Sequence, residues 1–182
     1  MASATVTSLQ AALLADSPAN GFEDLLGLYG QFVGDWDFEV DATGLDGARH
    51  TGTGEIHFGW ILGGRAIQDV WMIPRRASRT SNGSPMPVTG NWYGTTIRAY
   101  DPALGAWRIT WIDPATNTFR QQFGRASGAD IVQEGATESG ALSRWTFSEI
   151  RPSFFRWTAD VSVDAGVSWR RLVELHAHRS AR

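Results

Sequence analysis

The sequence predicts an all-β protein: an antiparallel up-and-down β-barrel of about ten strands, with a short N-terminal helix capping one end. Apolar and polar residues alternate with a period of two through most of the chain after Gly34, which is the pattern of half-buried strands. Short turns rich in Gly, Pro, Asp and Asn separate most of these segments. A meander of so many strands has edges to protect, and closure into a barrel removes them.

The N-terminal part is expected to hold a flexible tail followed by one helix. Residues 1–20 are rich in Ala, Ser and Thr, as mobile termini often are. Residues 21–182 should then form a single domain, which agrees with the chain length of 182 residues. Apolar residues at helical spacing predict an amphipathic helix over 22–33 that packs on the barrel or plugs it, although Gly27 and Gly30 weaken it. The apolar set is Phe22, Leu25, Leu26, Tyr29, Phe32 and Val33.

Ten segments carry the strand pattern, and well-formed turns such as DPALG (101–105) and DPATN (113–117) separate them. The one long gap, 75–90, is predicted to be a flexible loop, and long loops of this kind often act as lids. The expected strands are 35–43, 50–61, 65–74, 91–100, 106–113, 117–125, 129–137, 142–150, 154–163 and 167–178.

Alternation also predicts which side chains face the barrel interior. On strand 117–125 the expected inner face carries Phe119 and Phe123 with Gln121 between them. For strands 65–74 and 91–100, alternation does not decide which of the two faces points inward. The other expected inner residues are Trp36, Phe38, Val40, Trp107, Ile109, Trp111, Trp145, Phe147, Phe155, Trp157, Ala159 and Val161.

Nine Trp, nine Phe and three Tyr provide enough aromatic surface to line a cavity for a small hydrophobic molecule. A carboxyl group in such a cavity can exchange protons near neutral pH, and Arg or Tyr can stabilise a developing oxyanion. We therefore expect catalytic roles for Asp69, Arg98 and Tyr100. The expected ligand contacts are Trp60, Trp71, Trp92, Trp111, Asp113, Gln121, Phe147 and Trp157.

The composition excludes several kinds of chemistry. The chain has no Cys and no Lys, which rules out disulfides, thiol nucleophiles, zinc–thiolate sites, Schiff bases and P-loops. We expect no cofactor, since no dinucleotide-binding motif is present. A net charge of −3 without a basic patch argues against nucleic acid as a partner. No secretory signal or membrane-spanning run is visible, so we expect a cytoplasmic protein with no membrane partner, and a homodimer is one option.

A histidine pair near the C-terminus raises the question of a metal. In LVELHAHR (172–179), Glu174, His176 and His178 share one strand face and could hold a metal or, through a histidine, haem. The apolar face of this strand carries Val173, Leu175 and Ala177 instead. If the barrel buries its apolar faces, both histidines point outward, and we predict no metal site.

The motif GDW (34–36) directly after a short helix is similar to the GxW start of lipocalin-like (calycin) barrels. That resemblance implies that Trp36 closes one end and packs against an arginine of the last strand: Arg170, Arg171 or Arg179. Over residues 30–179, segments such as FVGDWDFEV and GWILGGRAIQDVW resemble the bacterial DUF1579-type family. This resemblance implies a lipocalin-like barrel but supplies no catalytic residues.

Three functions remain open from the sequence. The leading one is a cofactor-independent enzyme, such as a cyclase, isomerase or lyase, acting on a molecule inside the barrel. A non-catalytic carrier or sensor, binding haem or a lipophilic molecule, would need only the shape of the cavity. A third possibility is an interaction module that uses the apolar helix 22–33 as a docking surface.

Overall fold

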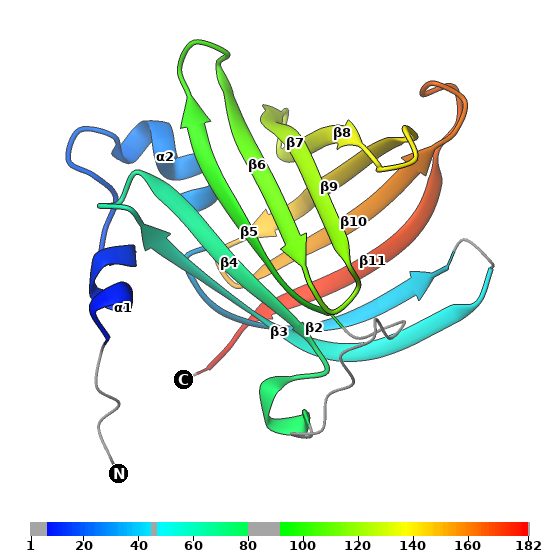
Figure 1. The fold of residues 1–182 in the computed structure, drawn as a ribbon, viewed down its shortest axis with the longest axis horizontal. Helices are drawn as coiled ribbons and strands as arrows, with labels where there is room; N and C mark the ends of the chain where they lie inside the picture. Colours follow the sequence, from blue (N-terminus) through cyan, green and yellow to red (C-terminus); the bar gives the residue numbers. More distant parts are fainter. Residues whose placement is uncertain (1–6, 45–46, 80–91, 182) are drawn as a thin grey trace.

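A computed structural model describes residues 7–44, 47–79 and 92–181. It shows a β-barrel with short helical elements packed around it (Figure 1). The helical elements are α1 (Ser8–Leu13), α2 (Glu23–Gly30) and the single 3-10 turn η1 (Arg76–Ser78). The first strands are β1 (Leu14–Ala15), β2 (Gly34–Thr43), β3 (Arg49–Ile61), β4 (Ala66–Ile73) and β5 (Trp92–Asp101). The remaining strands are β6 (Ala106–Asp113), β7 (Thr118–Ser127), β8 (Asp130–Ala136), β9 (Leu142–Arg151), β10 (Phe154–Ser162) and β11 (Arg170–Arg179).

Strands β2 to β11 form a closed antiparallel barrel in which each strand pairs with its neighbours in the sequence. The ring closes where β2 meets β11, with Val40 opposite Leu175. The short β1 pairs with the end of β3, where Leu14 lies opposite Ile61, beyond the stretch that pairs with β2. The predicted closed barrel of about ten strands is confirmed.

Helix α2 and the turn after it plug the end of the barrel at the upper left of Figure 1. The fully buried Tyr29 ring lies edge-on to Trp107, with ring centroids 4.9 Å apart. Phe32 lies 4.9 Å from Phe147 by the same measure. Gly30 has to be glycine because a Cβ there would lie 2.7 Å from the Trp60 indole. The predicted packing of this helix on the barrel therefore holds, although α2 is shorter than the expected range 22–33.

One arginine fastens this plug to the seam between β2 and β11. The Arg179 guanidinium donates hydrogen bonds to the carbonyls of Gln31 and Val33 (3.0 and 2.9 Å) and lies 4.3 Å above the Trp36 ring. Gly34, with φ +128°, leaves room for it, since a Cβ there would lie 2.6 Å from Arg179 Nη1. Of the three arginines that the GxW resemblance offered, Arg179 is the one that packs on Trp36.

The histidine pair of β11 faces outward, as the alternation predicted. His176 and His178 are exposed, and Phe154 of β10 lies against both rings on the outer surface. Glu174 on the same face pairs with Arg156 (2.7 Å), which holds the pKa of this carboxyl below its usual range. Among the described residues, no group of three or more His, Asp or Glu side chains could hold a metal ion.

The predicted facing of strand 117–125 is wrong. In β7, Phe119 and Phe123 are exposed on the outer surface, and Gln121 lies on the same outer face. The inner face carries Arg120, Gln122 and other polar or small residues instead. The polarity of this strand is reversed because its inner face borders a partly polar interior.

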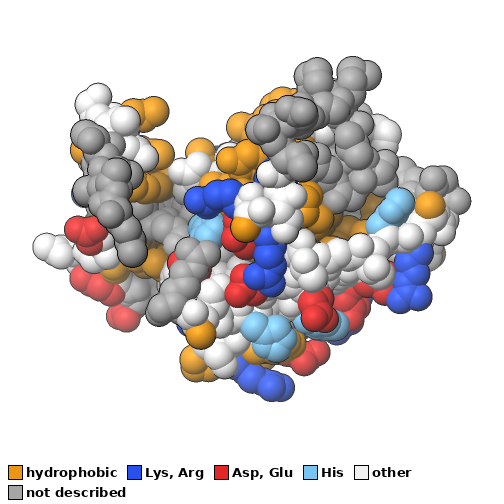
Figure 2. Space-filling model, turned by 90° about the horizontal axis from the view of Figure 1, so that it is seen from below, with side chains coloured by type: hydrophobic (Ala, Val, Ile, Leu, Met, Phe, Trp, Pro, Cys, Tyr) orange, Lys and Arg blue, Asp and Glu red, His pale blue; other side chains and the backbone are white. Residues whose placement is uncertain are grey.

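The N-terminal segment and the outer surface complete the description. Part of the segment expected to be a tail forms α1 and β1, over residues 8–15. Most of the loop expected over 75–90 lies outside the described residues. Figure 2 shows acidic, basic and histidine side chains interspersed over the face seen from below. Within the described part of the chain, no helix has the length and apolar character required to cross a bilayer.

Candidate binding site in the barrel

A cavity of about 270 Å³ lies inside the barrel, at the end away from the α2 plug. We call this end the mouth, because residues of the β6–β7 and β8–β9 turns, Thr116 and Thr137, reach the cavity wall. Five tryptophans dominate the lining, and polar side chains sit among them. The tryptophans are Trp71, Trp92, Trp111, Trp145 and Trp157, and the buried polar groups include Thr96, Arg98, Asp113 and Ser143.

Four of these tryptophans touch one another in a closed circuit across the barrel. Alternate positions of β4, β6, β9 and β10 bring their indoles to similar heights, and each packs on the next with its edge or at a tilt. The centroid distances are 6.4 Å (Trp71–Trp111), 6.1 Å (Trp111–Trp145), 5.4 Å (Trp145–Trp157) and 5.1 Å (Trp157–Trp71). This arrangement gives the cavity a rigid aromatic wall.

A buried ion pair lies on the plug side of the cavity. Arg98 of β5 and Asp69 of β4 are 1% and 0% exposed, and Arg98 Nη1 donates to Asp69 Oδ2. The other carboxylate oxygen accepts the backbone N–H of Thr96 at 3.0 Å. Both oxygens of Asp69 are therefore occupied, and only Arg98 of this pair reaches the cavity wall.

Beyond Arg98, towards the plug, lies a group of buried polar side chains. The Arg98 guanidinium lies 5.0 Å from the centre of the Tyr29 ring. Burial raises the pKa of the Tyr29 phenol well above its usual range, and the nearby positive charge of Arg98 opposes the rise. The phenol therefore stays protonated. Tyr29 Oη, both amide atoms of Gln133 and Arg98 Nε have no hydrogen-bond partner within the described part of the protein.

Asp113 ends β6 at the mouth. Its Oδ1 accepts hydrogen bonds from the backbone N–H groups of Tyr93, Ala115 and Thr116 at 3.3, 2.8 and 3.3 Å. Its Oδ2 is buried and has no partner among the residues described. The Trp111 indole and Asp113 both lie against Gly94 of β5. A Cβ on Gly94 would clash with that indole and would lie 2.8 Å from Asp113 Cβ.

The structure brings together six of the eleven site residues expected from the sequence and separates the other five. Trp71, Trp92, Arg98, Trp111, Asp113 and Trp157 all line the cavity.

The remaining five occupy other places. Asp69 lies behind Arg98, and Gln121 faces solvent. Trp60 and Phe147 pack against the plug, at Gly30 and Phe32 respectively. Tyr100 lies at the same end, with its ring 5.8 Å from that of Trp107.

Twelve of the eighteen lining residues were not among the expected contacts, and four of them show why. Trp145 was assigned to the inner face but not to the site, and alternation would have been enough to include it. Thr96 and Ser143 are small polar residues with no distinguishing sequence signal. Arg120 was missed because the alternation pattern assigned it to the outer face of its strand, whereas it lies on the inner face.

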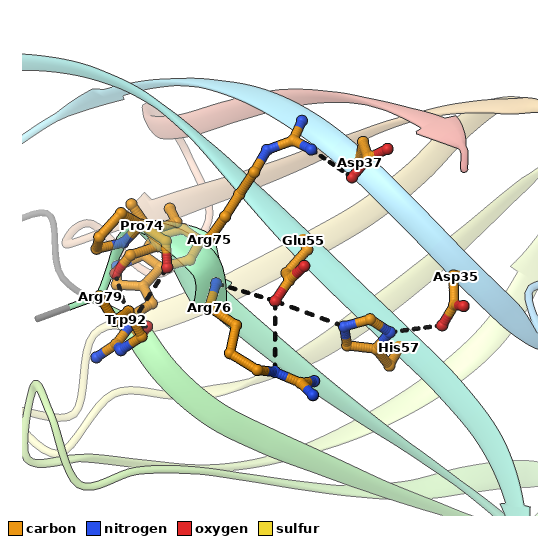
Figure 3. Close-up of polar contacts among 10 residues, drawn as sticks. Asp35, Asp37, Glu55, His57, Pro74, Arg75, Arg76, Arg79 and Trp92 are labelled. Carbon is orange, nitrogen blue, oxygen red and sulfur yellow. Dashed lines mark hydrogen bonds and ion pairs between the residues drawn. The ribbon is translucent and has the colours of Figure 1, made fainter. Parts of the chain in front are cut away.

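Three arginines hold the rim of the mouth, two through side chains of β2 and β3 and one through the start of β5 (Figure 3). Arg75 pairs with Asp37 (2.6 Å), and the backbone N–H of Arg76 donates to Glu55 (3.0 Å). Arg79 Nη1 donates to the carbonyl of Trp92, a residue of the cavity wall, at 3.0 Å. These contacts hold residues 75–79 next to Trp92 of the cavity wall.

Comparison with known proteins supports the fold alone. No family model and no curated protein matches the chain, so the resemblance to the DUF1579-type family stays a prediction. The solved structure of Rv2717c from M. tuberculosis is similar with a TM-score of 0.54 and 11% identity, covering 86% of this chain and 97% of that one. The S-type phycobiliprotein lyase CPES from Guillardia theta is similar with a TM-score of 0.57 and 8% identity, covering 87% and 93%. The lipocalin-like barrel is therefore shared with proteins of very different sequence.

Proposed function

We propose that this barrel binds a compact aromatic or hydrophobic molecule in its tryptophan-lined cavity. One observation carries the proposal: the indoles enclose free volume, although protein interiors are normally packed without large voids. The wall also contains buried polar atoms without partners in the described structure, namely Trp71 Nε1, Trp157 Nε1, Arg98 Nε and Asp113 Oδ2. Such atoms are costly to bury unpaired, and a ligand can supply the missing partners.

The volume limits the size of the ligand. Ordinary ligand pockets have volumes of about 300 to 1,000 Å³, and this cavity of about 270 Å³ lies just below that range. A molecule of one or two fused rings fits this space better than a macrocycle such as haem. The described wall also contains no histidine that could ligate haem iron.

We further propose that the bound molecule is converted without a cofactor, by an isomerase, lyase or cyclase type of reaction. Arg98 reaches the cavity wall and would stabilise negative charge that develops on the ligand. Asp113 would act as the proton acceptor, because its Oδ2 has no hydrogen-bond partner in the described structure. Asp69 would act as a positioning residue that holds Arg98. The name of the phycobiliprotein lyase supports the view that this barrel fold can serve an enzyme.

A carrier is the alternative, and one observation favours it. Of the three expected catalytic residues, Asp69 is fully hydrogen-bonded and Tyr100 lies at the plugged end, so only Arg98 borders the cavity. A carrier requires only the aromatic wall and the cavity shape. Turnover of a bound molecule would separate the two functions.

The binding proposal is tested by filling the cavity. Ala159 lines it, so Ala159→Leu should displace ligand, whereas Ala99→Leu is the matched control, because Ala99 is exposed on the outer face of β5, opposite Arg108. Native mass spectrometry of the purified protein would identify a co-purified molecule and also the oligomeric state. Titration with 2-naphthalenemethanol, followed by tryptophan fluorescence, should give saturable binding that only Ala159→Leu weakens. Absence of binding to the unmodified protein, or equal binding by both variants, would contradict the proposal.

A further inference from the structure

Two turns of the barrel begin with the same tripeptide, Asp-Pro-Ala, and they differ in one respect. In the turn that starts at Asp101, Oδ1 accepts the backbone N–H groups of Ala103 and Leu104, and Oδ2 accepts Arg108 Nε at 2.7 Å. In the turn that starts at Asp113, Oδ1 accepts the equivalent N–H groups, but Oδ2 is left without a partner in the described structure. Turn formation therefore accounts for one oxygen of Asp113 and not for the other.

The charges around the cavity show the same imbalance. Four charged side chains line it, and three of them have an ion-pair partner of opposite sign. Asp113 is 1% exposed and forms no ion pair with any described residue. A buried carboxylate without a counterion is unfavourable, because it has given up water and gained no opposite charge. The three compensated pairs are Arg98–Asp69, Arg120–Glu138 (3.7 Å) and Asp160–Arg171 (2.6 Å).

The surroundings of Asp113 suit a positive charge. The Trp111 indole and Asp113 both lie against Gly94. Trp92 precedes Tyr93 in the chain, and the backbone N–H of Tyr93 donates a hydrogen bond to Asp113. Indole faces carry negative electrostatic potential and attract ammonium groups, most strongly where water is excluded. A carboxylate in an aromatic cage is the combination that recognises organic cations.

We infer that the ligand of this cavity is a compact organic cation, an amine or quaternary ammonium compound, with Asp113 as its counterion. The inference rests on the proposed function, because it names the charge of the molecule that the cavity binds. A ligand with a carboxylate at this position would meet the like charge of Asp113. Arg98 and Arg120 offset this repulsion only in part, because each is already paired with an acidic side chain.

Three probes with one ring system test the charge: 2-naphthylmethyl-trimethylammonium, 2-naphthalenemethanol and 2-naphthoate. Tryptophan fluorescence and calorimetry with the full chain should show the ammonium probe binding at least about tenfold more tightly than the alcohol, and the carboxylate binding most weakly. Asp113→Asn keeps an oxygen for the turn amides but removes the charge. It should abolish the preference for the ammonium probe and leave the affinity for the alcohol within about threefold. Asp101→Asn, in the sister turn, is the matched control and should keep the preference.

The possible outcomes separate this inference from the proposed function. If alcohol and ammonium bind equally, or the carboxylate binds best, the cavity is a binding site but the inferred charge is wrong. The same conclusion follows if the ammonium preference survives Asp113→Asn. If none of the three probes binds the unmodified protein, the proposed function and the inference both fail. The comparison of probes on the unmodified protein needs no variant, so it remains decisive even if Asp113→Asn does not fold.

Discussion

Replacing Asp69 by Asn should destabilise the barrel strongly, although the two side chains have nearly the same shape. Asn keeps an oxygen that can accept the Thr96 N–H, so the β4–β5 contact survives. The Arg98 guanidinium, however, loses its only counter-charge among the described residues while remaining 1% exposed. Its Nε already lacks a hydrogen-bond partner there, so mainly the rings of Tyr29, Phe58 and Phe147 would be left to stabilise the cation.

The expected loss in free energy of unfolding is about 3–5 kcal/mol, the usual result of removing one partner of a buried ion pair. For a chain of 182 residues, each kcal/mol lowers the melting temperature by about 2–4 °C, so the total shift should be roughly 6–20 °C. The exposed pair Glu134–Arg144 is the control, since Glu134→Gln should cost at most about 1 kcal/mol. The double variant Asp69→Leu, Arg98→Met should recover most of the loss, because it leaves no unpaired charge.

Circular dichroism during thermal and urea unfolding measures all four proteins. The reasoning is refuted if Asp69→Asn loses no more stability than Glu134→Gln, or if the double variant is less stable than Asp69→Asn alone. The first result would mean that water reaches Arg98. The second would mean that packing of the pair, and not its charge balance, holds this part of the core.

Three further predictions concern the cavity, the pH dependence and the histidines. Gly94→Ala places a methyl group against the Trp111 indole, so it should shift the ring, cost about 1–3 kcal/mol in a urea titration and weaken the binding of 2-naphthalenemethanol. Hydrogen bonds from Ser168 above all lower the pKa of Asp164 from 3.8 to about 2. Its stabilising contribution should be complete above about pH 4 and disappear as the pH falls towards 2, and Asp164→Asn should flatten that part of the stability curve. Changing both histidines of β11 to Ala should leave probe binding and metal content unchanged, since both face outward; a loss of binding would place that face in the site.

Alternation predicted the fold where the barrel interior is apolar. Strands β2 and β10 bury Trp36, Phe38, Phe155 and Trp157 as expected, because their other faces are plainly polar. The same rule failed on β7, where Arg120 faces the cavity and a phenylalanine faces solvent. A strand whose inner face is polar loses the contrast on which the rule depends, whereas β6, β9 and β10 border the same cavity and have Trp111, Trp145 and Trp157 on the predicted inner face.

Alternation also gives the face of a residue but not its height along the barrel. Arg98 and Tyr100 share a face of β5, yet Arg98 borders the cavity and Tyr100 lies at the plugged end. Trp60 and Phe147 were misplaced for the same reason. Their heights depend on which end α2 closes, and that contact has no local signature in the sequence.

The clamp made by Arg179 has a consequence for how fast the protein folds. Its bonds to Val33 and Gln31 join residues separated by 146 and 148 positions, and the β2–β11 seam spans similar distances along the chain. Contacts between such distant segments form only after a large loss of chain entropy, which slows folding to milliseconds or longer. The seam should therefore be among the last parts to form, and until then the edges of β2 and β11 are open to pairing with other chains.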